Sequence, residues 1–177
     1  MRTHSFLIGL STAGIATILI SGCANIHSMK NKFDPQEISW VKEKGTNIIK
    51  GEAFLKTVGG DIKTCAGNTA VLTPVSDYSR ERILSLYGSD QKGIKQKFDG
   101  RSDNFNITDN RYKEYTIKSV CNSKGEYSFE KIPDGDYFLT AQIFWKSNPR
   151  SLFFEGGNIM QRVKVTGHET KEVILTY

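Results

Sequence analysis

Residues 125–145, GEYSFEKIPDGDYFLTAQIFW, decide the fold, because apolar and polar residues alternate on both sides of a turn signal. A period of two is typical of a β-strand that buries one face. Pro133-Asp134-Gly135 predicts the turn, since proline fixes φ and glycine adopts backbone conformations that other residues resist. We therefore expect two strands that form a hairpin-like unit and cover a core with their aromatic side chains.

Further segments alternate in the same way, and each is bounded by turn residues. They are residues 46–57, 68–74, 114–121, 158–167 and 169–177. With the two strands of the first stretch, the expected number is about seven, which favours an antiparallel β-sandwich. The 177 residues suit one ordinary domain, so we expect a mainly β protein whose sandwich spans residues 46–177.

A short helix is expected before the sandwich, over residues 34–45. Asp34 is a helix-capping residue, and Pro35 stands at the first helical position, where proline is favoured. Gly45 is a typical helix stop. This helix would lead directly into the first strand.

A second helix is expected to interrupt the strands. Ser76 or Asp77 caps its start, and Gly88 ends it. Residues 89–113 then contain few aliphatic residues and no clear period, which predicts a long polar loop. Helix and loop together form an insertion over residues 76–113.

The predicted loop contains three aromatic residues, Phe98, Phe105 and Tyr112. A polar loop has little need of three rings unless they dock on something, so they are candidates for contact with a partner. The alternative is that they pin the loop to the sandwich. A flexible insertion is the commoner case for this composition.

The amino terminus has the pattern of a secretory signal. Arg2 precedes an apolar stretch over residues 6–20, which is too short for a comfortable membrane span. Ile20-Ser21-Gly22-Cys23 then resembles the lipoprotein box of bacteria, in which an aliphatic residue and two small residues precede a cysteine. An ordinary cleaved signal with an incidental cysteine is the alternative.

The lipoprotein resemblance implies a cellular location. Residues 1–22 would be removed, Cys23 would carry diacylglycerol and an acylated amino group, and residues 23–33 would form a lipidated tether. Lipoproteins of this type that lack aspartate after the cysteine usually reach the outer membrane, and Ala24 stands there. We expect a protein anchored in the cell envelope by its lipid and facing the periplasm.

The mature chain would keep two cysteines, Cys65 and Cys121. In a compartment that oxidises thiols, a disulfide between them is the default. It would close a loop worth about 4 kcal/mol in the chain-entropy model. A metal-binding or reactive pair would need further ligands, but neither His27 nor His168 lies near Cys65 or Cys121 in sequence.

Two motifs carry a family resemblance. Gly125-Glu126-Tyr127-Ser128-Phe129 followed by Ile132-Pro133-Asp134-Gly135-Asp136-Tyr137 resembles the G-x-aromatic-x-F…(L/I)-P-x-G-x-Y pattern of carboxypeptidase regulatory-like domains. The resemblance implies a transthyretin-like sandwich over about residues 46–177. The helix and loop at 76–113 exceed a minimal domain of this kind. Because the matching residues are turn residues and core aromatics, the resemblance implies a fold and no particular chemistry.

Composition and motifs also bear on the class of function. With 24 Lys and Arg against 19 Asp and Glu, the net charge is +5 and forms no basic block, so nucleic acid is not an expected partner. His168 and the acids around the predicted turns fit exposed turn residues, and no catalytic constellation, metal site or cofactor motif is found. We expect a non-enzymatic protein without a cofactor.

Three hypotheses follow for such a protein. The first is a lipid-anchored β-sandwich that acts as a binding or assembly module in the envelope, with an envelope protein or a glycan as its partner. The second is an accessory lipoprotein of an envelope-spanning secretion machine. The third is a carbohydrate-binding or hydrolase-associated envelope protein, which requires an aromatic platform or an acidic pair to converge in space.

Overall fold

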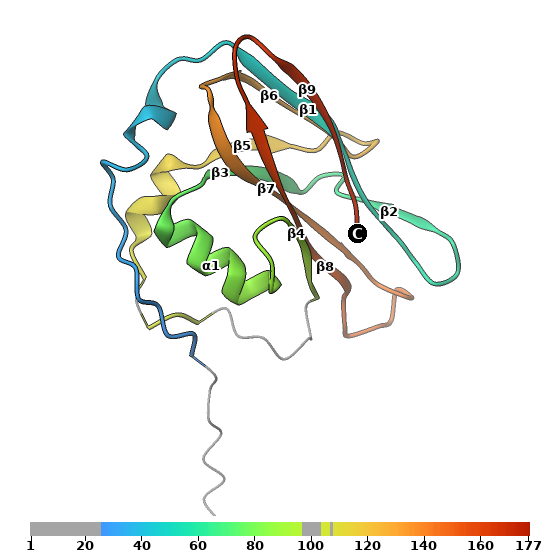
Figure 1. Ribbon diagram of the computed structural model, residues 1–177. Helices are drawn as coiled ribbons and strands as arrows, with labels where there is room; N and C mark the ends of the chain where they lie inside the picture. Colours follow the sequence, from blue (N-terminus) through green and yellow to red (C-terminus); the bar gives the residue numbers. More distant parts are fainter. Residues whose placement is uncertain (1–25, 97–103, 107) are drawn as a thin grey trace, which may run out of the picture.

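The structure is a computed structural model that describes residues 26–96, 104–106 and 108–177. Two β-sheets pack face to face, and one α-helix lies against the outer surface (Figure 1). The strands are β1 (Asn47–Lys56), β2 (Ile62–Thr64), β3 (Thr69–Pro74), β4 (Lys92–Gln96), β5 (Ile117–Val120), β6 (Glu126–Ile132), β7 (Gly135–Trp145), β8 (Glu155–Val165) and β9 (Thr170–Leu175). The helices are α1 (Asp77–Tyr87) and two 3-10 helices, η1 (Ser39–Lys42) and η2 (Asn110–Tyr115).

The expected β-sandwich is confirmed. One sheet has the order β2-β1-β6, with β9 pairing parallel to β1, and the other has the order β4-β8-β7-β3-β5. All other strand pairs are antiparallel. Along β1 the alternation of the sequence matches burial, since Ile49, Ala53 and Leu55 are buried and Lys50, Glu52 and Lys56 are exposed.

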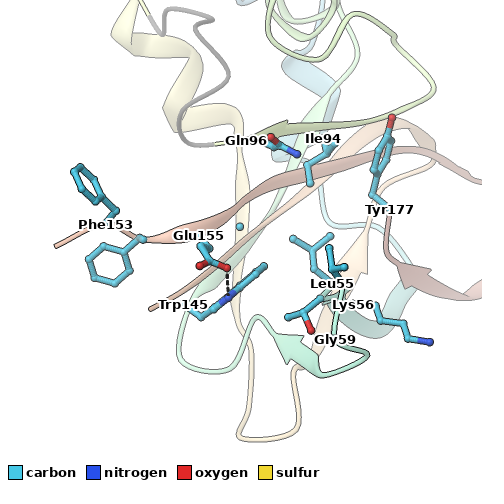
Figure 2. Close-up of a pocket in the computed structure, with 13 residues that line it drawn as sticks. Leu55, Lys56, Gly59, Ile94, Gln96, Trp145, Phe153, Glu155 and Tyr177 are labelled. Carbon is cyan, nitrogen blue, oxygen red and sulfur yellow. Dashed lines mark hydrogen bonds between the residues drawn. The ribbon is translucent and has the colours of Figure 1, made fainter. Parts of the chain in front are cut away.

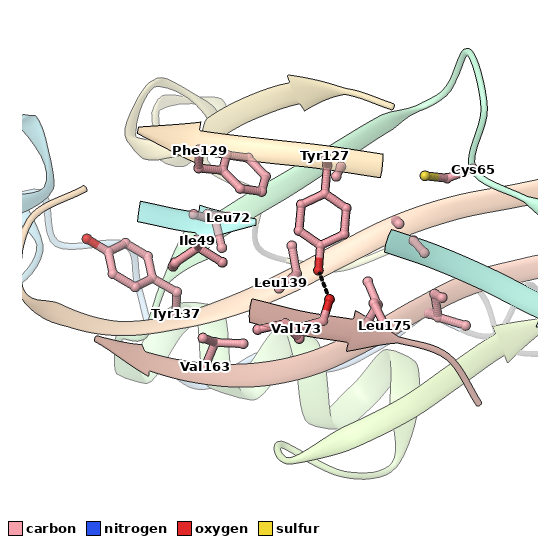
Figure 3. Close-up of a cluster of buried hydrophobic side chains, with 14 of the residues drawn as sticks. Ile49, Cys65, Leu72, Tyr127, Phe129, Tyr137, Leu139, Val163, Val173 and Leu175 are labelled. Atoms are coloured by element: carbon pink, nitrogen blue, oxygen red, sulfur yellow. Dashed lines mark hydrogen bonds between the residues drawn. The ribbon is translucent and has the colours of Figure 1, made fainter. Parts of the chain in front are cut away.

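The core lies between the two sheets (Figure 3). Its largest fully buried side chains from the sheets include Ile49, Leu72, Ile132, Tyr137, Leu139, Ile143, Ile159, Val165 and Leu175. Tyr127 reaches from β6 to β9, where its hydroxyl donates a hydrogen bond of 2.7 Å to the Val173 carbonyl oxygen. Burial raises the pKa of Tyr127 well above its ordinary value, so the hydroxyl remains a donor.

The expected hairpin over residues 125–145 is wrong, although both of its strands exist. β6 pairs with β1, whereas β7 pairs with β3 and β8, so Pro133 and Asp134 carry the chain from one sheet to the other. The Tyr137 hydroxyl closes this link by donating to the Pro133 carbonyl oxygen, 3.0 Å away. Residues 166–169 likewise connect β8 to β9 across the two sheets.

The helix predicted over residues 34–45 is a single 3-10 turn, η1. The Asp34 carboxylate accepts a hydrogen bond of 2.9 Å from the Gln36 amide in the turn before η1, and η1 itself has no side-chain cap. Phe33 and Ile38, on either side of this turn, are both buried in one cluster with Tyr78.

The second predicted helix is confirmed as α1. The Ser76 hydroxyl caps its start by accepting a hydrogen bond of 3.1 Å from the Ser79 amide. Gly88 ends it with φ at 75°. Ile83 packs with Phe138 and Met160, which point outward from the five-stranded sheet, so α1 covers part of the outer face of that sheet (Figure 1).

The long loop predicted over residues 89–113 is wrong in part, because it contains β4 and η2. β4 pairs with β8 along the edge of the five-stranded sheet. The strand could not be recognised from its sequence, KGIKQ, because its buried positions are Gly93 and Lys95. Neither residue has the large apolar side chain that marks a buried strand position.

The segment expected to be a tether is attached to the rest of the fold from His27 onward, where the His27 amide donates to the Asn104 carbonyl oxygen. The Lys30 and Asn31 amides each donate a hydrogen bond of 2.8 Å to the Glu81 carboxylate on α1. Met29 and Phe33 are buried. Partial burial raises the pKa of Glu81, but the amide hydrogen bonds outweigh it and hold the pKa below its ordinary value.

The predicted disulfide between Cys65 and Cys121 is confirmed. Cys65 lies between β2 and β3, and Cys121 follows β5, with their Cα atoms 5.8 Å apart. Both cysteines are buried. Because β2 and β5 belong to different sheets, the disulfide links the two layers of the sandwich.

Candidate functional site

A groove of about 700 Å³ opens where the β1–β2 turn, the β7–β8 connection, β4 and the carboxyl terminus come together (Figure 2). Its lining residues are Leu55, Lys56, Thr57, Val58, Gly59, Ile94, Gln96, Trp145, Phe153, Phe154, Glu155, Gly156 and Tyr177. We call it the aromatic groove. Four of its residues are aromatic, and they come from three separate parts of the chain.

Large apolar side chains around the aromatic groove are left in water. Phe153 is 67% exposed, Phe154 is 40% exposed and Tyr177 is 65% exposed. Val58, in the β1–β2 turn, is fully exposed. Exposed apolar patches of this kind, with polar groups around them, mark binding surfaces.

Trp145 is held in place by its cross-strand partner, Glu155. The two residues face each other in the β7–β8 register, and the indole N–H donates a hydrogen bond of 3.0 Å to the Glu155 carboxylate (Figure 2). The indole also lies against Gly156, where an added Cβ would overlap the ring. The strand register and this hydrogen bond together orient the ring.

Polar groups stand around this apolar surface. Lys56 and Gln96 are exposed at the rim. The Lys146 ammonium lies 5.2 Å from the centre of the Phe154 ring. Figure 2 shows Phe153 and Tyr177 on opposite sides of Trp145. The groove thus offers flat rings for stacking, with hydrogen-bonding groups beside them.

The loop aromatics predicted as contact residues lie elsewhere, around α1. The Phe105 ring stacks on the Arg82 guanidinium, with 3.9 Å between the guanidinium carbon and the ring centre. Tyr112 lies 5.7 Å from Tyr78, measured between ring centres. Both rings are half-buried and pack against α1 and the amino-terminal segment. Phe98 lies outside the described residues, as does the predicted lipid-bearing Cys23.

The acids around the turns do not form a cluster. Asp134 accepts a hydrogen bond from Asn47, and Asp136 pairs with Arg162 at 2.7 Å. Within residues 26–96, 104–106 and 108–177, no group of three or more His, Cys, Asp or Glu is arranged to hold a metal ion. The same residues contain no helix that is long and apolar enough to cross a membrane.

The residues of the aromatic groove are not among the site residues predicted from the sequence. One signal was available, since Leu152-Phe153-Phe154 places three large apolar residues inside the otherwise polar segment KSNPRS–EGG. No sequence pattern indicates that Trp145 and Tyr177 line the same groove, because this depends on how the ends of the strands pack together.

No family model matches this chain, and no curated protein is significantly similar to it in sequence. Among solved structures, the fold is similar to that of a Pseudomonas aeruginosa protein described as a "putative carbohydrate binding protein". The TM-score is 0.69 and the identity is 21%, over 83% of this chain and 99% of that chain. At this identity the similarity shows a common fold.

Proposed function

We propose that the protein is a non-enzymatic, lipid-anchored envelope module that binds a glycan in the aromatic groove. The observation that carries the proposal is the fixed Trp145 ring with exposed Phe153, Phe154 and Tyr177 around it. A pyranose has a face of C–H bonds that packs on an aromatic ring and a perimeter of hydroxyl groups that need polar partners. The groove has both kinds of group within one surface.

The description of the Pseudomonas aeruginosa neighbour supports a carbohydrate as the ligand class. The acidic side chains of the groove are also too few for ordinary glycoside hydrolysis, which favours a binding role. Glu155 is the single acidic side chain among the lining residues, and it accepts a hydrogen bond from the Trp145 indole N–H. Glycoside hydrolysis ordinarily needs two carboxyl groups on either side of the scissile bond.

Lipid anchoring rests on the sequence pattern that ends at Cys23. The mass of the amino-terminal peptide of the protein isolated from cell membranes tests it. We expect a peptide that begins at Cys23 and carries acyl groups. A free thiol at Cys23, or a chain that still includes residues 1–22, would contradict the anchor and leave the glycan site untouched.

Calorimetric titration tests the binding proposal. Neutral hexasaccharides that differ in linkage and substituents, such as maltohexaose, cellohexaose and chitohexaose, are titrated into the detergent-solubilised protein. We expect at least one to bind, and Trp145→Ala to weaken binding by about tenfold or more.

The matched control is Val120→Ala, because Val120 is a 69% exposed apolar residue on β5, outside the groove. This variant should bind like the parent protein. If Trp145→Ala bound every sugar as well as Val120→Ala did, the aromatic groove would not be the glycan site.

A further inference from the structure

A second hollow surface runs along the outer face of the five-stranded sheet, beside α1. Two adjoining hollows of about 260 Å³ and 360 Å³ make it up, and they share Val71, Tyr87, Lys118 and Thr140. We call the combined surface the sheet trough. It shares no lining residue with the aromatic groove.

Two unpaired polar atoms mark the sheet trough. Among the described residues, the buried side-chain nitrogen and oxygen atoms without a hydrogen-bond partner are Nη1 of Arg82 and Oδ1 of Asn158. Arg82 lines one hollow and Asn158 lines the other. Leaving a buried donor or acceptor unpaired costs about 1–3 kcal/mol, so such groups call for an explanation.

The charge of the sheet trough has one sign. Arg82, Lys113 and Lys118 line it, and none of its lining residues is acidic. The Arg82 guanidinium is held between rings, with its central carbon 3.9 Å from the centre of Phe105 and 4.9 Å from that of Tyr112. These rings contact the guanidinium but supply no acceptor for its Nη1 group, which leaves that group to pair with an anion.

The floor of the sheet trough can recognise hydroxyl groups. Thr140 and Gln142 of β7 and Thr73 of β3 supply hydroxyl and amide groups, beside the unpaired Asn158 oxygen. Tyr87 on α1 adds an aromatic wall that both hollows share. Anion-binding, hydroxyl-binding and stacking groups thus lie along one surface.

We propose that the sheet trough binds an acidic saccharide. Its carboxylates pair with the cations Arg82, Lys113 and Lys118, and a sugar hydroxyl donates to the Asn158 oxygen. Since Nη1 and Oδ1 are buried in the free protein, both side chains rotate on binding. This site is separate from the aromatic groove, so a test of one site does not decide the other.

Calorimetry with a matched pair of sugars tests the acidic site. The probes are tetragalacturonate and its methyl ester, which has the same skeleton without the charges. We expect the acid to bind, the ester to bind at least about tenfold more weakly, and the affinity for the acid to fall as salt is raised.

Lys118→Glu is the informative variant, because Lys118 lines both hollows and is exposed, so the change leaves the core intact. This variant should bind tetragalacturonate about tenfold more weakly, or weaker still. Lys44→Glu makes the same charge change at an exposed lysine outside the trough and should have little effect.

Three outcomes would overturn the assignment of the sheet trough. In the first, tetragalacturonate does not bind at all. In the second, Lys118→Glu and Lys44→Glu lower the affinity for tetragalacturonate equally. In the third, Trp145→Ala abolishes tetragalacturonate binding. The last result would move the acidic sugar to the aromatic groove and would leave glycan binding there intact.

Discussion

The side-chain amide of Asn47 donates a hydrogen bond of 2.8 Å to the Asp134 carboxylate, and this pair joins both links that cross between the sheets. The same amide donates to the Ile132 carbonyl oxygen, just before the first link. The Glu169 amide of the second link donates to the Asn47 oxygen, 2.8 Å away. One buried asparagine thus fixes how the chain changes sheets twice.

Asn47→Ala should therefore destabilise the protein strongly. The change removes three hydrogen bonds of a buried side chain, one of them to the buried Ile132 carbonyl oxygen, and we expect a loss of about 3 kcal/mol in the free energy of unfolding. Denaturant unfolding of the two proteins measures it. Thr46→Ala, at the exposed neighbouring position, should change the stability by less than about 0.5 kcal/mol. Equal stabilities for the two variants would contradict the role of Asn47.

Asp134 should make the stability depend on pH in the acid range. The hydrogen bond from Asn47, followed by that from the Gly167 amide, lowers the pKa of Asp134 below its ordinary value. Its contribution is therefore complete above the unfolded pKa of about 4 and is lost as pH falls through the lower folded pKa. In Asp134→Asn, unfolding free energies measured from neutral to acid pH should fall less steeply than in the parent. An identical slope would contradict this.

The disulfide should contribute a large share of the stability. Cys65 and Cys121 are 56 residues apart, and a closed loop of this length is worth about 4 kcal/mol in the chain-entropy model. The double variant with serine at both positions should unfold at a much lower denaturant concentration than the oxidised protein. Adding a reductant should destabilise the parent and leave the double variant unchanged. A parent insensitive to reductant under unfolding conditions would argue against the bond.

Glu81 should control the order of the segment that follows the predicted lipid site. Glu81→Ala removes the acceptor of the Lys30 and Asn31 amides, so hydrogen exchange at these two amides should become at least about tenfold faster. Glu130→Ala, at an exposed site on β6, serves as the control and should leave both rates unchanged. Unchanged exchange in Glu81→Ala would mean that other contacts hold the segment.

The inward faces of the strands could be predicted because burial imposes a period of two on the sequence. Tyr127 and Phe129 of β6 and Leu139 of β7 are buried as their spacing indicates. Alternation says nothing about which strand lies alongside, however. The assignment of β6 and β7 to different sheets depends on hydrogen bonds between distant residues, such as Asn47 and Asp134.

The aromatic groove could not be predicted for a related reason. Trp145 and Glu155 lie on neighbouring strands and can be paired once the β7–β8 register is known. Tyr177 and the turn after β1 reach the same surface only through the three-dimensional packing of the strand ends. Fold class and disulfide pairing were accessible to sequence reasoning, whereas a site built from separated exposed residues was not.

The most direct test of the glycan site uses the two tryptophans of the chain. Their indole N–H groups give separate signals in a ¹⁵N correlation spectrum, which can be followed while the neutral hexasaccharides are added. The Trp145 signal should shift with saturation, and the Trp40 signal should stay in place, because its indole bonds to the Glu37 carbonyl oxygen outside the groove. A bound sugar that left the Trp145 signal unmoved would contradict glycan binding in the aromatic groove.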